Sequence, residues 1–135
     1  MSIVLLGSTS GSCTLQEQAV AGTTTLTLPT TTGTLALTSE VIGVSQTWQD
    51  VTASRAIGTT YTNSTGKPIY IAVAGTGSAI NVRANIATGG VTIVGNGAAG
   101  SGFYVNNAAI IPAGSTYSVS TPTGTLTLQS WTELR

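Results

Sequence analysis

Hydrophobic and polar residues alternate with a period of two along much of the chain. The clearest case is Ile80–Ile86, which reads Ile-Asn-Val-Arg-Ala-Asn-Ile. Strict alternation of this kind is typical of a β-strand with one buried and one solvated face. No window of a dozen residues shows the helical period, and only Gln16–Ala21 could form a helical turn. The chain is therefore predicted to be all-β.

After residue 44, Gly, Pro and Asn interrupt the hydrophobic pattern at short intervals, as they do in turns between strands. The predicted strands are Thr47–Thr52, Gly58–Thr62, Ile69–Ala74, Ala79–Ile86, Val91–Val94, Phe103–Val105, Ala109–Ile111, Thr116–Ser120 and Thr125–Trp131. Short antiparallel strands at this spacing favour two packed sheets. We therefore predict that residues 45–135 form an antiparallel, jelly-roll-like β-sandwich.

Residues 1–44 have a simpler pattern with two short predicted strands. In Thr24–Leu28 and Leu35–Thr38 the leucines fall on alternate positions, so each strand offers two leucines to one face. A two-stranded hairpin of this size is only marginally stable in water. We therefore expect residues 1–44 to form a short N-terminal β-stalk with other copies of the chain, and residues 45–135 to form the head.

Charged residues are scarce. They make up 6% of the chain, four basic and four acidic, against about 25% in a typical soluble domain. With a net charge of zero, the chain lacks the clustered basic surface that nucleic-acid binding requires. Its apolar runs are far shorter than the roughly 20 residues that a membrane-spanning helix needs, so no membrane insertion is expected. We expect Thr, Ser and Asn to hydrate part of the surface and other chains to cover the rest.

The sequence offers little catalytic chemistry. It contains no histidine and a single cysteine, which excludes the usual zinc sites and the histidine-dependent catalytic constellations. Asp50 and Glu133 are the only carboxylate pair in the predicted head, and a glycosidase needs such a pair. We expect them instead to balance the charges of Arg55, Arg83 or Lys67. The protein is therefore predicted not to be an enzyme and to hold neither a metal nor a cofactor.

Gly95–Gly100 fits the G-x-G-x-x-G pattern of dinucleotide-binding loops. That motif must open a helix, whose N-terminus then holds the pyrophosphate. The following residues, Ser101–Val105, have a strand pattern instead. We therefore interpret Gly95–Gly100 as a flexible loop rather than as a nucleotide site.

Candidates for surface contact lie on the predicted loops, where aromatic and amide side chains suit adaptable polar recognition. They are Tyr61, Asn63, Lys67, Asn96, Tyr104, Asn106 and Asn107. The alternative is that they are solvated loop residues without a partner. Trp48 and Trp131 lie at strand-like positions, and we interpret them as core or interface residues rather than as sugar-stacking ones.

Five stretches of the head form a recognisable set: Thr47–Arg55, Gly58–Asn63, Gly66–Ile69, Ile111–Tyr117 and Trp131–Arg135. Together they resemble the C-terminal head domains of tailed-bacteriophage tail fibres and tail-associated structural proteins. The preceding Gly22–Thr38 resembles a segment that is common before such heads in phage and prophage structural proteins. The resemblance covers Gly22–Arg135.

The resemblance implies a homotrimeric virion protein, assembled in the host cytoplasm, whose distal head contacts a glycan or a protein of the host surface. Its other partners would be virion proteins of the tail, baseplate or capsid, bound through residues 1–44. Members of this group usually carry such segments at the end of long chains with their own attachment domain. Here residues 1–21 would have to dock onto the virion.

Two other functions are compatible with the sequence. A stand-alone carbohydrate-binding β-sandwich module predicts a binding site within one chain and a dispensable N-terminus. A capsid decoration protein without a receptor role predicts that its removal lowers particle stability and leaves adsorption unchanged.

Overall fold

The computed structural model describes residues 2–6, 9–16, 22, 30, 32, 41–97 and 102–135. The chain divides into two units, Met1–Thr34 and Leu35–Arg135. The predicted strands Thr24–Leu28 and Leu35–Thr38 lie outside the described residues, and so does the candidate helical turn beyond Gln16.

The N-terminal unit contains an antiparallel hairpin, which precedes the strands that the sequence predicts. Its strands are β1 (Ser2–Leu6) and β2 (Ser12–Gln16), paired in register along their whole length. Val4, Leu5 and Leu6 are 54%, 55% and 83% exposed. Because neighbouring residues of a strand face opposite sides, both faces of this hairpin carry exposed apolar side chains.

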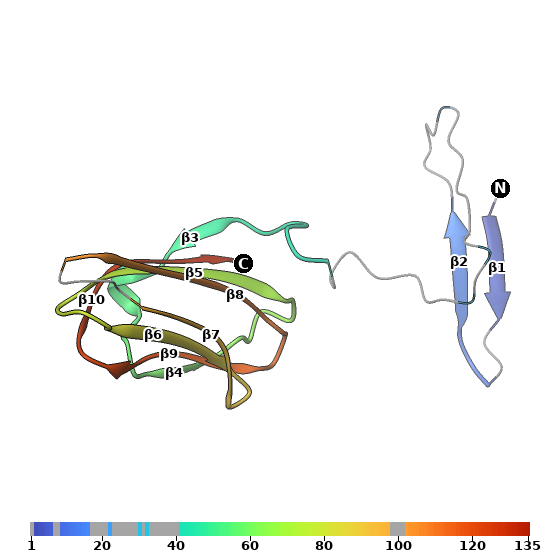
Figure 1. The fold of residues 1–135 in the computed structure, drawn as a ribbon. Coiled ribbons are helices and arrows are strands. Elements are labelled where there is room, and N and C mark those ends of the chain that lie inside the picture. Colours follow the sequence, from blue (N-terminus) through green and yellow to red (C-terminus); the bar gives the residue numbers. More distant parts are fainter. Residues whose placement is uncertain are drawn as a thin grey trace. The chain divides into compact units, whose positions relative to one another are not determined.

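The C-terminal unit is a β-sandwich of two four-stranded antiparallel sheets (Figure 1). Sheet I contains, in order, β3 (Trp48–Asp50), β10 (Leu126–Leu134), β5 (Ile69–Gly77) and β8 (Tyr104–Ile111). Sheet II contains, in order, β4 (Thr60–Thr62), β9 (Thr116–Thr123), β6 (Arg83–Thr88) and β7 (Val91–Gly97). A 3-10 turn, η2 (Thr52–Ser54), follows β3, and the described part of the chain contains no α-helix. The predicted all-β sandwich is confirmed.

The strands of the sandwich pair in a nested order. β6 pairs with β7, β5 with β8, β4 with β9 and β3 with β10. The pairs of β5 with β10 and of β6 with β9 then complete the two sheets. This is the jelly-roll arrangement, in which a long folded-over ribbon is rolled into two layers. As a result β10, the last strand, lies inside sheet I between β3 and β5.

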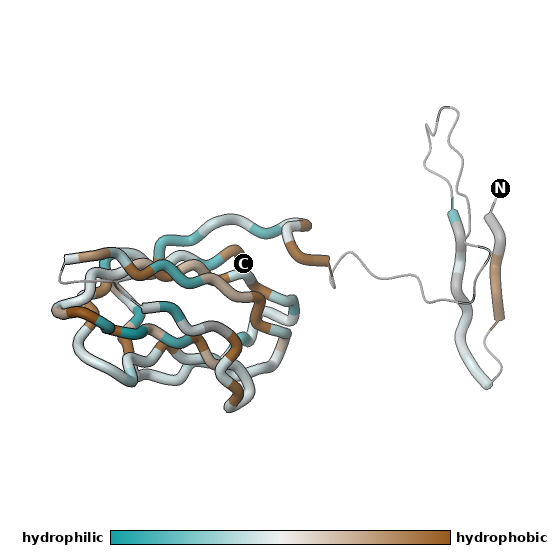
Figure 2. Tube along the Cα trace, viewed as in Figure 1, coloured by the Kyte–Doolittle hydropathy of each residue, from teal (hydrophilic) through white to brown (hydrophobic). Residues whose placement is uncertain are grey.

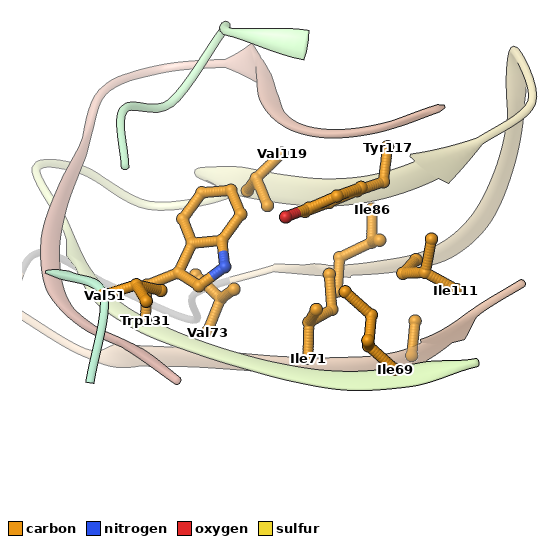
Figure 3. Packing of buried hydrophobic residues seen from close by; sticks show 10 residues of the cluster. Val51, Ile69, Ile71, Val73, Ile86, Ile111, Tyr117, Val119 and Trp131 are labelled. Atoms are coloured by element: carbon orange, nitrogen blue, oxygen red, sulfur yellow. The ribbon is translucent and has the colours of Figure 1, made fainter. Parts of the chain in front are cut away.

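Strand alternation builds the core between the two sheets. In β5 every second residue is buried and the residues between them are half-buried. Trp131 of β10 is fully buried in one cluster with Val51, Val73 and Tyr117 (Figure 3). Because apolar burial is the main driving force for folding, this cluster is the chief source of the sandwich's stability.

One irregularity in β10 changes which residues face the core. Between Leu128 and Ser130 strand β10 advances by two residues while β5 advances by one, so Gln129 is an extra residue, a β-bulge. On the N-terminal side of the bulge the even-numbered residues of β10 face the core. On its C-terminal side the odd-numbered ones do, including Trp131 and Glu133.

The start of β6 differs from the prediction. The sequence pattern placed the beginning of this strand at Ala79, whereas β6 begins at Arg83. Asn81 adopts a left-handed φ of 64° and turns the chain before the strand starts. Ile80, expected on the buried face, is therefore exposed.

Strand β8 is continuous where the sequence predicted two strands separated by residues 106–108. Asn107 faces the core, and its Nδ2 donates to the carbonyl oxygen of Ala84 at 2.8 Å. This hydrogen bond allows an amide side chain, usually typical of turns, to occupy a core-facing strand position.

Hydrophobic residues also lie on the segment that leads into β3 (Figure 2), where Val41 and Val44 are exposed. Lys67 Nζ donates to the carbonyl oxygen of Val44 at 3.2 Å, and Gln46 Nε2 donates to that of Pro68 at 2.8 Å. These two hydrogen bonds hold the segment before β3 against the loop before β5. The segment is therefore part of the sandwich.

Candidate functional site

A fully buried carboxylate, Glu133, joins three segments of the sandwich. Arg55 binds both its oxygens, with Nε 2.9 Å from Oε1 and Nη2 3.0 Å from Oε2. Tyr117 donates its hydroxyl to Oε1 at 2.7 Å, and Arg135 Nη1 lies 3.3 Å from Oε2. The cluster therefore ties β10 to β9 and to the segment after η2.

The surroundings of Glu133 fix the charges of its partners. Burial disfavours the phenolate of Tyr117, and the hydrogen bond and charge of Glu133 add to this, which raises the pKa of Tyr117 to about 12. Burial opposes the charge on Arg55, but the hydrogen bond and charge of Glu133 outweigh it, and the pKa of Arg55 is raised. Because both oxygens of Glu133 are engaged, the cluster acts as a structural clamp and offers no free carboxylate for proton transfer.

Asp50, the other carboxylate of the predicted pair, faces the opposite side of sheet I. It is the cross-strand partner of Thr132, which faces outward. Hydrogen bonds from Thr52 Oγ1, at 2.6 Å, and from Thr52 N, at 3.0 Å, lower the pKa of Asp50. The predicted charge balance is confirmed for Glu133 with Arg55, whereas the hydrogen bonds of Asp50 come from Thr52.

Asn63, predicted as a surface contact, is only 2% exposed. Its Nδ2 donates to the carbonyl oxygens of Lys67 at 2.7 Å and of Ile111 and Pro112 at 3.1 Å. Its Oδ1 accepts from the backbone and hydroxyl groups of Thr65 at 3.2 and 2.8 Å. The expectation of surface contact is corrected for Asn63, because these bonds inside the protein use its amide.

Two further candidates are also built into the protein. Asn107 is 6% exposed and links β8 to β6, so it too is corrected as a surface contact. Tyr61 is half-buried, its hydroxyl accepts from Ala56 N at 2.8 Å, and the Arg55 guanidinium lies 4.5 Å from its ring centroid. The ring of Tyr61 therefore supports the Glu133 cluster.

The exposed candidates lie on strands rather than on loops. Asn96 of β7 donates its Nδ2 to the carbonyl oxygen of Asn106 of β8 at 3.4 Å. Tyr104 lies two residues from Asn106 on the same face of β8 and is also exposed. The structure thus joins Asn96 to Asn106 and places Tyr104 on the same face as Asn106. Lys67 contacts Val44 instead.

The outer face of sheet I carries a feature that was not apparent from the sequence. At one end of this face, cross-strand neighbours on all four strands form an apolar row: Trp48, Leu134, Tyr70 and Ile110. Trp48 and Ile110 are 55% and 53% exposed. The rings of Trp48 and Tyr70 meet edge to face with centroids 5.8 Å apart. These four residues are named the aromatic row.

Beside the aromatic row the outer face of sheet I is hollowed. The hollow has a volume of about 160 Å³, and its lining includes Ala72, Ala74, Asn106, Ser130 and Thr132. These residues come from the three strands β5, β8 and β10, and most of them are small. Short side chains leave the backbone close to the surface, so the hollow is open and shallow.

The outer face of sheet II has a different chemistry. It contains a smaller hollow of about 120 Å³, lined in part by Thr60, Thr116 and Ser118. Both tyrosines of this sheet, Tyr61 and Tyr117, lie in or against the core. In the described residues, aromatic side chains of the strands therefore reach an outer face only on sheet I.

A partial signal for the aromatic row is present in the sequence. In the predicted strand Ile69–Ala74 the residues Tyr70, Ala72 and Ala74 alternate with apolar ones, which places all three on one face. The row itself could not be found, because it requires the register of four strands that lie far apart in sequence.

In the part of the chain that the structure describes, no group of three or more His, Cys, Asp or Glu residues could hold a metal ion. Nor do these residues form a helix with the length and hydropathy needed to cross a membrane. Comparison with protein-family models, with curated proteins and with solved structures finds no match for this chain.

Proposed function

We propose that the protein is a structural component of a tailed-phage virion, a short homotrimeric fibre or spike whose sandwich head contacts the host surface. This proposal is supported by the resemblance of Gly22–Arg135 to the head domains of phage fibres and to a segment that commonly precedes them. The single observation that carries it is the β1–β2 hairpin, because apolar side chains are exposed on both of its faces.

A hairpin of this kind is not expected to persist alone in water. Two paired strands are marginally stable at best, and here Leu5 on one face and Val4 and Leu6 on the other are all exposed. Among the described residues each of these strands also pairs along one edge, and the backbone groups of its other edge can pair with another chain. Association with further copies would bury both faces and both edges together.

The scarcity of charge favours such an association. Of the eight charged residues in the sequence, Arg55, Glu133 and Arg135 are joined in one cluster. Because few charges remain outside this cluster, copies of the chain can approach each other with little electrostatic repulsion. In a trimer, three identical heads would strengthen a weak host contact through multivalency.

The molar mass in solution tests the proposal. Light scattering after size exclusion should give three chains for the full-length protein and one chain for a fragment Val41–Arg135. The fragment begins at Val41 so that it keeps the bonds of Val44 and Gln46. Leu5→Ser should weaken the trimer, and Thr14→Ser, an exposed control on β2, should not.

A monomeric full-length protein would contradict the proposal and favour a single-chain carbohydrate-binding module. A fragment that forms trimers would contradict the role given to the hairpin. The location is tested separately, with gold-labelled antibody on intact particles. Label at the tail would support the proposal, whereas label over the capsid would favour a decoration protein.

A further inference from the structure

We propose that the outer face of sheet I binds a neutral glycan, which lies across the strands beside the aromatic row. This inference deepens the proposed function and rests on it for the origin of the ligand at the host surface. It moves the contact from the loops to a sheet face, and of the residues predicted from the sequence it retains Tyr104 and Asn106.

The chemistry of this face matches that of a sugar ring. A pyranose presents C–H groups on its faces, which pack against aromatic rings, and hydroxyl groups around its rim. Trp48 and Tyr70 supply the aromatic surface. Asn106, Ser130 and Thr132 line the adjacent hollow and supply amide and hydroxyl groups for hydrogen bonds with a ligand. Aromatic side chains with a few placed polar groups are the usual composition of a ligand site.

The shape of the hollow favours part of a polymer over an enclosed small molecule. Its volume of about 160 Å³ is below the roughly 300–1,000 Å³ of typical small-molecule pockets. Its lining comes from adjacent strands β8, β5 and β10, so the depression crosses the sheet. An extended chain could place one ring in it and continue past the aromatic row.

The charge of this face selects a neutral ligand. Cross-strand neighbours from the aromatic row to Tyr104 include one charged residue, Asp50, which is the partner of Thr132. The carboxylate of Asp50 accepts hydrogen bonds from Thr52, which keep it ionised. A phosphorylated, sulfated or uronic-acid polymer would meet this carboxylate and no Lys or Arg in these rows. Repulsion therefore disfavours anionic polymers.

The two tryptophans provide a direct readout in the full-length protein. Trp48 is 55% exposed in the aromatic row, whereas Trp131 is fully buried. The probes are hexasaccharides of glucose, mannose and N-acetylglucosamine, with polysialic acid as the anionic control. At least one neutral probe should change the Trp48 emission with a saturable dependence on concentration, and polysialic acid should not.

Variants locate the site. Trp48→Ala should weaken binding of the neutral probe at least tenfold in calorimetry, and Trp48→Phe should restore most of it. Thr60→Ala, in the hollow of sheet II, is the matched control and should bind as the wild type does. Circular dichroism of each variant should show the same β-sheet content, because Trp48 lies outside the core.

Four results would overturn the inference: no response to any neutral probe, a response to polysialic acid alone, unchanged affinity of Trp48→Ala, or a lower molar mass of Trp48→Ala. The last would show that the aromatic row is a contact between subunits. A trimer that binds no sugar would overturn this inference and leave the proposed function intact. A monomer that binds sugar through Trp48 would support this inference and overturn the proposed function.

Discussion

At the scale of single residues, Glu133 shows how this protein uses its few charges. A buried carboxylate is costly unless it is paired and hydrogen-bonded. Arg55, Arg135 and Tyr117 supply the required partners. The same pairing means that loss of the Glu133 carboxylate leaves Arg55 and Tyr117 without their partner in a largely buried place.

Replacement of Glu133 by glutamine is therefore expected to destabilise the sandwich. The variant keeps the shape of the side chain but leaves the Arg55 guanidinium without its counter-charge. Breaking a buried ion pair typically costs about 3–5 kcal/mol. Urea unfolding should show a loss of about 3 kcal/mol in the free energy of unfolding. Asp50→Asn, at an exposed position, should cause a smaller change, and an equal loss would contradict the structural role of Glu133.

Tyr117 is expected to make the stability fall at alkaline pH. Its pKa is raised from 10.0 to about 12, so the folded protein favours the neutral phenol more than the unfolded chain does. This contribution is fully present below pH 10 and is lost as the pH rises towards 12.

Tyr117→Phe tests this expectation. The variant loses the 2.7 Å hydrogen bond to Glu133 and should be less stable at neutral pH, but its stability should fall less steeply between pH 10 and 12. Urea unfolding across that range is the measurement. Tyr104→Phe, an exposed control, should keep the slope of the wild type. If Tyr117→Phe kept it as well, the role of Tyr117 would be refuted.

At the scale of elements, Gly75 in β5 marks a close approach between two strands. A Cβ at this position would lie 2.7 Å from Leu126 Cγ and 2.8 Å from the carbonyl oxygen of Thr127. Overpacking of this kind costs about 1–3 kcal/mol. Gly75→Ala should therefore lower the urea midpoint. Gly97→Ala, whose Cβ would meet its nearest neighbour at 3.5 Å, should not, and equal effects would argue against this close approach.

The sequence was sufficient to predict the strands of the sandwich, but neither all of their limits nor the β1–β2 hairpin. The two-residue period identified the β-strands and the sandwich, because burial of one face imposes that period. It failed at Asn81 and at Asn107, where asparagine turns the chain in one case and bonds across the core in the other. The choice between these roles depends on a tertiary partner, which local pattern does not contain.

At the scale of the whole molecule, the two outer faces of the sandwich differ in chemistry. Sheet I presents the aromatic row and its hollow, whereas the hollow of sheet II is lined by Thr60, Thr116 and Ser118. The candidate site on sheet I joins Trp48 with Leu134, which are 86 positions apart in sequence. The alternation in the sequence assigns each residue to one face of its own strand. The jelly-roll pairing of the strands is needed to bring these residues into one surface.

The bulge at Gln129 has a consequence for how this chain can diverge. Gln129 is one residue more than the partner strand β5 has at this point, and the pairing is regular on both sides of it. Loss of Gln129 alone would therefore remove the bulge and leave Trp131 and Glu133 facing the core. Loss of Thr132, by contrast, would turn Glu133 outward. A descendant can therefore replace or lose this one residue without changing which residues behind it are buried.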